Sequence, residues 1–580
     1  MSRLEELKAA TTRRDIANIL GFKAKALAYI LFHRKTPNYQ QFEIPKRKGG
    51  SRLISAPCPE LKKLQRRLSE LFQDCIGEIN KSRNIESAIS HGFRRKFSII
   101  TNASVHRKRR YVFNIDLENF FGTINFGRVR GFFLRNQNFE LNSDVATVLA
   151  QIARHENALP QGSPCSPVIS NLIGHILDIR LAALSNQVGC FYSRYADDLT
   201  FSTNKRNFPA EVAIPFGENP HQWQAGRKLK RIVDKEGFRI NNAKTRMQYM
   251  DSRQDVTGLV VNSKVNTHVE YRHTARAMVH RLLNAGSFQM KQHNLDESGN
   301  PVVIEVDGTM EQLNGILSFI DSVNLSNNNK AVEASEKAKG FKPPESLNCN
   351  ERVYRHFLFY KNFHMSKRPM IICEGKTDYI YLDCAIKRLA DAHPSLAKKE
   401  DDGSIVLKVS FLKRSETIKR LLGLTGGTGE FNKFITLFRR EQKNIAVAGK
   451  KNPVILLVDN DDGAKSLYSY IKEIKKSPVD PKSQYIFITD NLYVLPTPLT
   501  ADGKGTTIED FFEIGLKKSK LNGKTFNPSD KGFNPKTEYG KYLFAKLVVK
   551  KNQASINFSS FNPLLERIEA LLDDYKRKLS

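Results

Sequence analysis

The chain is poor in cysteine and lacks long apolar runs. Its 580 residues include seven cysteines, an odd number: Cys58, Cys75, Cys165, Cys190, Cys349, Cys373 and Cys384. None forms a C-x-x-C pair, which argues against a zinc ribbon and favours a reducing compartment, so a cytoplasmic location is expected. We find no run of about 18 apolar residues and no apolar signal region at the N-terminus, so neither a transmembrane helix nor a secretory leader is expected.

Acidic residues are also scarce relative to basic ones. Asp and Glu total 60 against 92 Lys and Arg, a formal net charge of +32. This excess favours a polyanionic partner, with nucleic acid first, over a merely soluble basic protein. We expect no membrane partner, because the sequence shows neither a polybasic amphipathic helix nor a lipidation signal. The length predicts two to four domains.

The first half of the chain mixes helices and short strands. Helices are expected over residues 1–35 and 59–80, with a strand–turn–strand pattern between them at 40–57. Short apolar strands alternate with helices over 111–262, and residues 265–323 are expected to be mostly helical.

The second half has a different composition. Residues 324–350 contain three successive asparagines and two successive prolines, which predicts a linker, and an aromatic helix is expected over 351–364. The apolar runs at 369–373 and 453–458 each end before an acidic residue. Such runs are typical of strands buried on both faces of a parallel sheet, so an α/β domain with its site at the carboxyl ends of the strands is expected.

The most informative segment is YADD at residues 195–198. Strand-forming residues lie on both sides of it, which predicts a β-hairpin with Asp197 and Asp198 at the turn. Two adjacent carboxylates repel each other and are hard to desolvate without a counter-ion. A bound divalent metal neutralises both carboxylates. Polymerases use such a metal to bring a hydroxyl and a triphosphate together.

Three further motifs accompany the hairpin in a fixed order. Asp116 ends an apolar strand, QGSP at 161–164 precedes an apolar helix at 168–184, and a segment from Gly237 to Lys244 follows the hairpin. This ordered set resembles reverse transcriptases of the bacterial retron and group II intron type, over residues 40–262. The resemblance implies an α+β right-hand polymerase with fingers and palm over about 1–262 and a helical thumb over about 263–323.

Two short patterns favour retrons over introns. NASVH at 102–106 matches the retron N-A-x-x-H pattern, and VTG at 256–258 matches a retron pattern before the thumb. The resemblance implies an RNA-directed DNA polymerase that copies a cognate structured RNA into a branched RNA–DNA hybrid, msDNA. Synthesis in this family is primed from a 2′-hydroxyl of the template RNA itself.

The resemblance also assigns residue roles. Asp116 and Asp197 are expected to hold two Mg²⁺ ions, supported by Asp198. Nucleotide-binding roles fall to Arg52 as a triphosphate clamp, Phe121 as the ring that selects dNTPs, Gln161 in the nucleotide pocket and Lys244 near the leaving group. Core packing remains the alternative for Phe121, and plain surface charge remains the alternative for Arg52 and Lys244.

Four residues are expected to bind RNA on the strength of the retron patterns. Asn102 and His106 are expected to touch RNA or to brace the finger loop, with a purely structural histidine as the alternative. Thr257 and Gly258 are expected to contribute to RNA recognition, although Gly258 alone could serve as a turn.

A second acidic constellation lies in the C-terminal half. Glu374 follows the strand at 369–373, and Asp459 and Asp461 follow the strand at 453–458. Together these residues resemble a TOPRIM domain, the metal-binding module of topoisomerases, primases and some nucleases, over about 367–515. The domain itself is expected to extend with its C-terminal addition over 367–580, after a linker and connecting helix at 324–366.

The TOPRIM resemblance implies a Mg²⁺ or Mn²⁺ site that acts on a phosphodiester. Glu374, Asp459 and Asp461 would bind the metal, a glycine turn at 424–429 would lie between the two acidic strands, Glu509 would support a second metal, and Lys541 would be the basic partner. Asp378 and Asp462 could belong to the site or cap helices; capping is the preferred interpretation of Asp378. A topoisomerase needs a tyrosine-bearing module and a primase a zinc ribbon, so nuclease is the predicted activity.

The two resemblances together suggest a polymerase fused to a toxic effector of anti-phage defence. Expected partners are the cognate retron RNA and its product, dNTPs and a nucleic-acid target of the TOPRIM domain. Three alternatives remain: a TOPRIM nuclease that trims the retron product, a non-catalytic scaffold, and a free-standing polymerase that copies arbitrary RNA. The sequence leaves the oligomeric state open, a homo-oligomer included.

Overall fold

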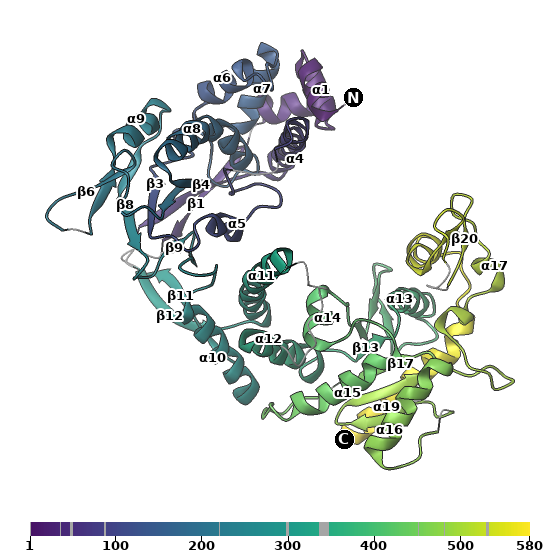
Figure 1. The fold of residues 1–580 in the computed structure, drawn as a ribbon. Helices are drawn as coiled ribbons and strands as arrows, with labels where there is room; N and C mark the ends of the chain where they lie inside the picture. The colour runs from purple at the N-terminus through teal and green to yellow at the C-terminus, as the bar shows by residue number, and fades with distance from the viewer. Residues whose placement is uncertain are drawn as a thin grey trace. The chain divides into compact units, whose positions relative to one another are not determined.

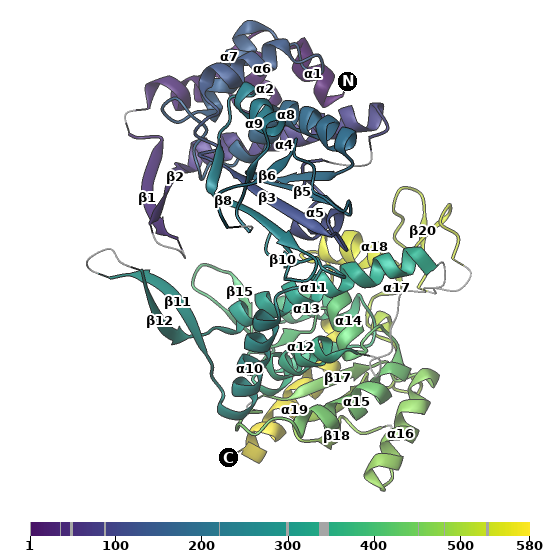
Figure 2. The same cartoon turned by 60° about the vertical axis from the view of Figure 1, so that its left-hand side comes forward.

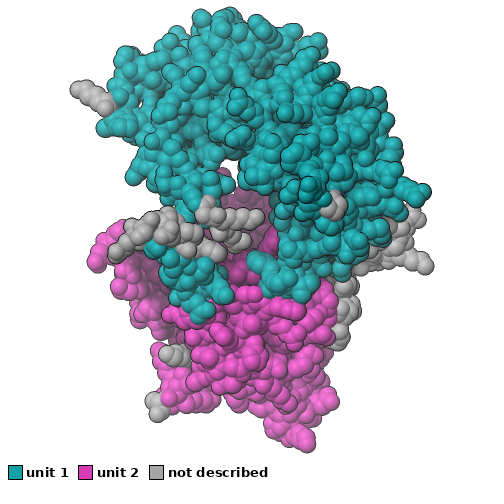
Figure 3. Space-filling view, turned by 90° about the vertical axis from the view of Figure 1, so that its left-hand side faces the viewer, with its two compact units in different colours: residues 1–272, 290–306, 322–335 teal, residues 273–289, 307–321, 336–580 magenta. Residues whose placement is uncertain are grey.

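The structure is a computed structural model that describes residues 2–34, 36–46, 50–85, 89–219, 221–296, 301–335, 347–450, 452–480, 482–528 and 533–579. The chain forms two compact units, coloured separately in Figure 3. The N-terminal unit comprises residues 1–272, 290–306 and 322–335. The C-terminal unit comprises residues 273–289, 307–321 and 336–580. The predicted thumb is therefore divided between the two units.

The N-terminal unit begins with short helices and a two-stranded ribbon. Helices α1 (Arg3–Ala9), α2 (Arg13–Ile19) and α3 (Ala24–Ala28) precede β1 (Tyr39–Pro45) and β2 (Ser51–Pro57), which pair antiparallel. The strand–turn–strand prediction is confirmed for both strands, while residues 47–49 of its turn lie outside the described residues. Helix α4 (Pro59–Ser82) follows; one face is buried because its leucines recur every three or four residues, at Leu61, Leu64, Leu68 and Leu71.

The centre of the N-terminal unit is an antiparallel sheet with strand order β4-β5-β3-β8. Its strands are β3 (Tyr111–Leu117), β4 (Phe191–Tyr195), β5 (Asp198–Thr203) and β8 (Ile240–Tyr249). The predicted hairpin is confirmed as β4 and β5. Helices α6 (Phe126–Arg135), α7 (Ser143–Ala153) and α8 (Ser166–Val188) share one apolar core with this sheet, and Figure 2 shows β3, β5 and β8 beside α8.

Helix α8 is long and apolar enough to cross a membrane by length and composition alone. However, 56% of its most apolar window is buried inside the protein, where residues such as Leu177 and Leu181 are fully enclosed. A core helix of a folded domain passes the same test, so this one helix is weak evidence for a membrane span.

Helix α9 (Arg227–Lys235) differs from the sequence expectation. It buries Leu229 and Val233 and exposes five basic residues: Arg227, Lys228, Lys230, Arg231 and Lys235. The expectation that the chain has no basic amphipathic helix was therefore wrong. The helix lies on the N-terminal unit as a positively charged surface ridge, which suits a phosphate backbone.

The segment 265–323 is only partly helical. Helices α10 (Val269–Ala285) and α11 (Met310–Ser335) are separated by a ribbon of β11 (Gln289–Leu295) and β12 (Pro301–Asp307). The β-branched run at 302–304 explains the strand that the helical prediction missed. Helix α11 also continues into the predicted linker, because residues 324–335 contain neither proline nor glycine; residues 336–346 lie outside the described residues.

The smaller elements of the N-terminal unit complete its frame. They are a π-helical turn at Tyr29–His33, α5 (Ile99–Val105), β6 (Ala213–Pro215), β7 (Trp223–Ala225), β9 (Asp255–Val256) and β10 (Leu259–Val260).

The C-terminal unit contains a mixed, mainly parallel sheet with strand order β16-β13-β17-β19-β18. Strands β16 (Ser410–Phe411), β13 (Met370–Cys373), β17 (Val454–Val458) and β19 (Leu492–Pro496) are parallel, and β18 (Ile486–Thr489) is antiparallel to β19. Every residue of β13 and β17 is buried, as the apolar runs predicted. Helices α13 (Asp378–Arg388), α15 (Thr428–Gln442), α16 (Lys465–Lys475) and α19 (Asn562–Leu579) surround the sheet (Figure 1), which confirms an α/β domain.

Other elements of the C-terminal unit flank this sheet. They are α12 (Cys349–Phe359), a π-helical turn at Tyr360–His364, β14 (Ala397–Lys399), β15 (Ile405–Leu407), α14 (Glu416–Leu422), 3-10 turns at Asp462–Ala464, Ile508–Phe511 and Ser559–Phe561, α17 (Ile514–Lys517), β20 (Thr525–Phe526), β21 (Glu538–Tyr539), α18 (Lys541–Leu543) and a π-helical turn at Phe544–Lys550. The aromatic helix predicted over 351–364 is confirmed by α12 and the turn after it.

Buried ion pairs tie residues 307–321 to the C-terminal unit. The Arg420 guanidinium lies 2.5 Å from Asp321 and 2.7 Å from Glu351, and all three side chains are nearly inaccessible to solvent. Tyr354 also donates a hydrogen bond to Asn314 across 3.2 Å. Charges buried in this way must stay paired, so this part of α11 is held with α12 and α14.

Candidate active sites

Sheet register brings the three aspartates of the N-terminal unit together. Asp116, the penultimate residue of β3, lies directly opposite Asp198, the first residue of β5. Ala196 adopts a left-handed φ of +57° in the tight turn between β4 and β5. The Asp197 carbonyl accepts a 2.9 Å hydrogen bond from the Leu117 amide, which fixes the turn against the end of β3.

Crowding shifts the ionisation of the two hairpin acids. Protein atoms surround the Asp198 carboxyl on most sides although part of the residue stays open to solvent, and this burial, with Asp197 and Asp116 nearby, raises its pKa to about 6. Burial also raises the pKa of Asp197, and the charges of Lys244 and Arg52 act in the opposite direction. Both acids would gain from a nearby cation.

Lys244 supplies one positive charge to this group. Its ammonium lies 3.0 Å from both carboxylate oxygens of Asp116, and the Asn241 amide donates to the same carboxylate across 3.3 Å. The Lys244 side chain is 62% exposed, so it is a mobile counter-ion rather than a buried one. The structure thus pairs Lys244 with an acid of the hairpin site, and its role near the leaving group stays a prediction.

The donor set suits a hard divalent ion. Carboxylate oxygens are the ligands that Mg²⁺ prefers, and burial raises the pKa of both Asp197 and Asp198. Among the residues that the structure describes, no three His, Cys, Asp or Glu side chains are grouped closely enough to hold a metal as they stand. Asp116, Asp197 and Asp198 are the residues that would hold the metal, and Lys244 now occupies the Asp116 carboxylate.

The predicted nucleotide-pocket residues come from segments that contact each other. The Gln161 carbonyl accepts a 2.8 Å hydrogen bond from the Ser55 amide of β2. Gly162 has a φ of +122°, and a Cβ there would lie 2.6 Å from the Ser55 carbonyl oxygen, so only glycine fits. Arg52, also on β2, is exposed.

The two adjacent phenylalanines after β3 have different surroundings. Phe120 is 2% exposed and stacks on Phe238 with ring centroids 5.5 Å apart, so it belongs to the core. Phe121 is only partly buried and lies 6.3 Å from the exposed ring of Phe93. Phe121 is thus the more accessible of the two rings, and its role in dNTP selection stays a prediction.

Asn102 and His106 act as structural supports in this structure, and their contact with RNA stays a prediction. Both are fully buried. The Ser193 hydroxyl donates to Asn102 across 2.7 Å and lies 2.8 Å from His106 Nε2, while His106 Nδ1 lies 2.7 Å from the Ser202 hydroxyl. Burial lowers the pKa of His106 to about 3, so a neutral ring braces β4 against β5. Bracing was the second of the two expected roles, but here the residues brace the hairpin and not the finger loop.

Thr257 and Gly258 form an accessible turn between β9 and β10. Both have left-handed φ angles, +47° and +78°. Thr257 donates a hydrogen bond to the Ile99 carbonyl across 3.3 Å, whereas a Cβ on Gly258 would meet nothing within 4 Å. Their role in RNA recognition stays a prediction, and the open space at Gly258 leaves room for it.

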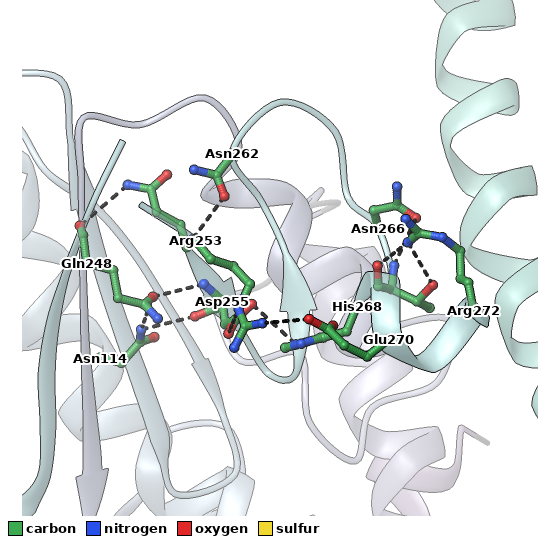
Figure 4. Close-up of polar contacts among 11 residues, drawn as sticks. Asn114, Gln248, Arg253, Asp255, Asn262, Asn266, His268, Glu270 and Arg272 are labelled. Atoms are coloured by element: carbon green, nitrogen blue, oxygen red, sulfur yellow. Dashed lines mark hydrogen bonds and ion pairs between the residues drawn. The ribbon is translucent and has the colours of Figure 1, made fainter. Parts of the chain in front are cut away.

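A polar network surrounds Asp255 of β9, the strand that precedes this turn (Figure 4). Gln248 accepts from the Asn114 amide at 3.1 Å and from the Asp255 backbone amide at 2.9 Å. The Asp255 carboxylate in turn lies 3.3 Å from both Arg253 and His268. The network therefore joins the central strands β3 and β8 to the segment that leads into α10.

The sequence did not lead us to the buried residue that supports the hairpin from inside the core. Arg194 is fully buried and makes two 2.7 Å hydrogen bonds to the carboxylate of Asp178 on α8. The same guanidinium donates to the Ala196 carbonyl across 3.0 Å, within the catalytic turn. A charged residue inside an apolar strand, with an aspartate inside an apolar helix, was the available signal, because buried charges are paired.

The C-terminal unit brings Glu374 and Asp459 together at the carboxyl ends of β13 and β17. The Asp459 amide donates to the Glu374 carboxylate across 3.2 Å, and the Glu374 amide donates to the Leu457 carbonyl across 3.0 Å. Burial, with Asp378, Glu374 and Glu509 nearby, raises the pKa of Asp459 to about 8. The predicted convergence of these two strand ends is present.

Asp378 belongs to this acidic group rather than serving as the helix cap that was predicted. Thr377 is the N-cap of α13, and Asp378 accepts a 2.6 Å hydrogen bond from the Gly375 amide. Asp378 is 4% exposed; burial and the neighbouring Glu509 raise its pKa to about 6. The loop from Glu374 to Asp378 thus contributes two acids.

Glu509 and Lys541 complete the group as an ion pair. Lys541 Nζ lies 3.0 Å from Glu509 Oε1, and Glu509 is 4% exposed. Burial disfavours the charged ammonium, but Glu509, Asp378 and Asp459 outweigh it and raise the pKa of Lys541. Lys541 therefore stays charged beside the acids of this group.

Asp461 and Asp462 lie outside the buried group. Asp461 is exposed and accepts a 2.8 Å hydrogen bond from the Gly463 amide, as the cap of a 3-10 turn. Asp462 pairs with Lys465 at 2.7 Å on the surface. The glycine turn predicted at 424–429 leads into α15, with Gly426 and Gly427 at φ angles of +129° and +96°.

Comparison with known proteins finds matches to part of the N-terminal unit. A family model described as reverse transcriptase (RNA-dependent DNA polymerase) matches residues 44–271, the segment that holds all three aspartates of the hairpin site. The structure of apo telomerase from Candida tropicalis is similar at a TM-score of 0.30 and 12% identity, over 55% of this chain and 61% of that one.

The curated relatives that match this chain are retron enzymes. The retron Mx162 reverse transcriptase of Myxococcus xanthus is 32% identical over 55% of this chain and 64% of its own length. The retron Ec86 reverse transcriptase of Escherichia coli is 29% identical over 52% of this chain and 82% of its own length. The match thus spans slightly under two thirds of the first relative. These relatives support the retron reverse transcriptase family for the N-terminal part of the chain.

Proposed function

We propose that the chain is a retron reverse transcriptase, an RNA-directed DNA polymerase. The observation that carries the proposal is the register of Asp116 opposite Asp198, with Asp197 in the turn between β4 and β5. The match of residues 44–271 to the reverse transcriptase family supports it.

Each residue of the site has its own proposed role in nucleotide addition. Asp116 and Asp197 would hold Mg²⁺, which activates the attacking hydroxyl and neutralises the departing pyrophosphate. Lys244, once released from Asp116, would neutralise phosphate charge, and Arg52 would offer its exposed guanidinium to the triphosphate. Phe121 would exclude a ribose 2′-hydroxyl, and the Gln161–Gly162 backbone would shape the pocket wall.

The proposed substrate is a cognate structured RNA, primed from its own 2′-hydroxyl to make msDNA. Relatives named as retron reverse transcriptases, the net charge of +32 and the basic ridge of α9 support it. To test the proposal, the full chain is purified from its native locus and its bound nucleic acid is sequenced. Wild type should carry a branched RNA–DNA hybrid and Asp197→Ala only RNA; DNA still attached to Asp197→Ala contradicts the proposal.

We propose a second activity for the C-terminal unit, a metal-dependent TOPRIM nuclease. The approach of Glu374 to Asp459, with Asp378 and the Glu509–Lys541 pair beside them, supports it. Mg²⁺ or Mn²⁺ would be held by Glu374 and Asp459, with Asp461 and Glu509 as further acids, and would activate water for attack on a phosphodiester. Metal-dependent cleavage by the purified protein, lost in Glu374→Ala, would support this activity; equal cleavage by both contradicts it.

The proposed biological role is a cytoplasmic defence system in which the retron product controls the nuclease. All seven cysteines are free, as in a reducing compartment. The ends of the retron product made by Asp459→Ala, compared with wild type, distinguish two roles. Unchanged ends with lost toxicity favour an effector, and altered ends favour a processing nuclease. Cleavage-deficient protein with undiminished defence would instead favour a scaffold.

A further inference from the structure

We propose that a cavity beside the catalytic hairpin binds one nucleotide of the strand whose hydroxyl is extended. This inference rests on the proposed polymerase function. The cavity has a volume of about 490 Å³, and its lining includes Phe93, Phe97, Tyr195, Arg94 and Glu70. Aromatic faces, a guanidinium and a carboxylate are the groups that stack a base, hold a phosphate and accept from a base edge or ribose.

The wall that carries Phe93 is pressed against the catalytic turn. A Cβ on Gly92 would lie 2.7 Å from the Ala196 amide nitrogen, and the His91 amide donates to the Arg194 carbonyl across 2.8 Å. The cavity therefore moves with the hairpin that bears Asp197. A strand held there stays in register with the metal site.

Phe93 is held in an unfavourable backbone conformation with its ring in solvent. Its φ is +55° although it carries a bulky side chain, and 41% of the residue is exposed. The Gln73 amide donates to its carbonyl across 2.9 Å and fixes that conformation. Strain combined with an exposed apolar ring points to a ligand that covers the ring.

The Phe93 ring is close to two other aromatic rings of the site. Phe93 lies 6.4 Å from Tyr195 and 6.3 Å from Phe121, centroid to centroid. Tyr195 lines the cavity, two residues before Asp197. A base stacked on Phe93 is thus next to Phe121, the ring proposed to exclude nucleotides that carry a ribose 2′-hydroxyl.

The charges favour a single nucleotide over a triphosphate. Arg95 is paired with Asp74 at 2.6 Å, whereas in the described part of the chain no carboxylate pairs with Arg94, whose guanidinium lies 4.9 Å above the Phe97 ring. Burial lowers the pKa of Arg94, so the group is poorly solvated. One free guanidinium matches one phosphodiester, and the Glu70 carboxylate repels additional phosphate charge.

The test measures strand binding and nucleotide use separately on the full chain. The probe is a DNA primer on an RNA template with 2-aminopurine at the primer 3′ end, bound without dNTPs. Phe93→Ala and Arg94→Gln should each weaken primer binding about tenfold, reduce the quenching of the probe and raise KM for primer while KM for dNTP stays unchanged. Phe93→Trp should restore quenching, because it restores stacking.

The control is Phe191→Ala, which removes another exposed ring, one that is 47% exposed and lies under Arg109. It should leave primer binding and quenching unchanged. A raised KM for dNTP with unchanged primer binding in Phe93→Ala overturns the inference and assigns the cavity to the triphosphate. Because binding is measured without synthesis, failure of the polymerase proposal shows separately, as a wild-type protein that binds primer but does not extend it.

Discussion

In the N-terminal unit the acids lie on neighbouring antiparallel strands, whereas in the C-terminal unit they follow parallel strands and enter from loops. The first group is neutralised by Lys244, a largely exposed lysine on the adjacent strand. The second contains Lys541 paired with a buried glutamate, and its central acid has the more strongly raised pKa, about 8 for Asp459 against about 6 for Asp198. Both arrangements crowd carboxylates, but the second excludes more water from them. The difference predicts that the two sites respond unequally to mutation, pH and metal.

The largest expected effect comes from the buried support of the hairpin. Arg194→Met leaves Asp178 as an unpaired buried carboxylate, so we expect a loss of about 3–5 kcal/mol in unfolding free energy of the N-terminal unit, measured by urea denaturation. The control is Arg180→Met, on the helix α8 that carries Asp178. It removes an exposed arginine from a surface ion pair and should cost less than about 1 kcal/mol.

The double variant Arg194→Met with Asp178→Leu separates stability from positioning. It should recover much of the stability because no charge is left buried. DNA synthesis should stay reduced, chiefly in kcat, because Ala196 has lost its donor, while cleavage by the C-terminal unit is unaffected. Full recovery of kcat would show that Arg194 serves stability alone.

The next effect is a pH dependence specific to the N-terminal unit. The pKa of His106 falls from 6.5 to about 3 on folding, so above pH 6.5 both states are neutral and the stabilising contribution is complete. Below pH 6.5 only the unfolded state takes up the proton, and stability falls by about 1.4 kcal/mol per pH unit until pH 3. His106→Gln should flatten this slope in urea denaturation between pH 7 and 5, and the exposed control His221→Gln should not.

Metal binding should release protons unequally at the two sites. Below pH 8 Asp459 must lose a proton before it binds a metal, so apparent affinity at the C-terminal site should rise about tenfold per pH unit up to pH 8. At the hairpin site the rise should end near pH 6, where Asp198 ionises. Calorimetry with Mn²⁺ at pH 7 in buffers of different ionisation enthalpy, on Asp197→Ala and Glu374→Ala, measures each site alone; equal proton release contradicts the contrast.

The smallest effects compare the two lysines. Lys244→Met removes an exposed partner of Asp116 and should cost less than about 1 kcal/mol of stability. Lys541→Met leaves Glu509 buried without its ammonium and should cost about 1–3 kcal/mol. Thermal denaturation of both variants without metal checks the order, and a costlier Lys244→Met would reverse the comparison.

The sequence predicts those features that depend on local pattern. Alternating strand formers around Asp197 and fully apolar runs before Glu374 and Asp459 define both sheets and the positions of their acids. The β11–β12 ribbon was missed because its β-branched run is short and lies between two helical segments. The continuation of α11 into the predicted linker was missed because asparagines were interpreted as a break, although Asn327 donates to the Val265 carbonyl at 2.7 Å.

Contacts between distant residues could not be predicted in the same way. Burial of Asn102 and His106 depends on serines 87 or more positions along the chain. Membership of Asp378 in the acidic group depends on Glu509 and Lys541, which only the tertiary fold brings near. The strain at Phe93 likewise has no signal in composition or periodicity.

The most direct test of two separate sites is a crossed assay on one full-length preparation. DNA synthesis on the cognate RNA and metal-dependent cleavage of nucleic acid are measured for wild type, Asp197→Ala and Glu374→Ala. The account predicts that Asp197→Ala loses synthesis by at least about 10³-fold and retains cleavage, and that Glu374→Ala does the reverse. Loss of both activities in either variant, with the fold intact by circular dichroism, would contradict it.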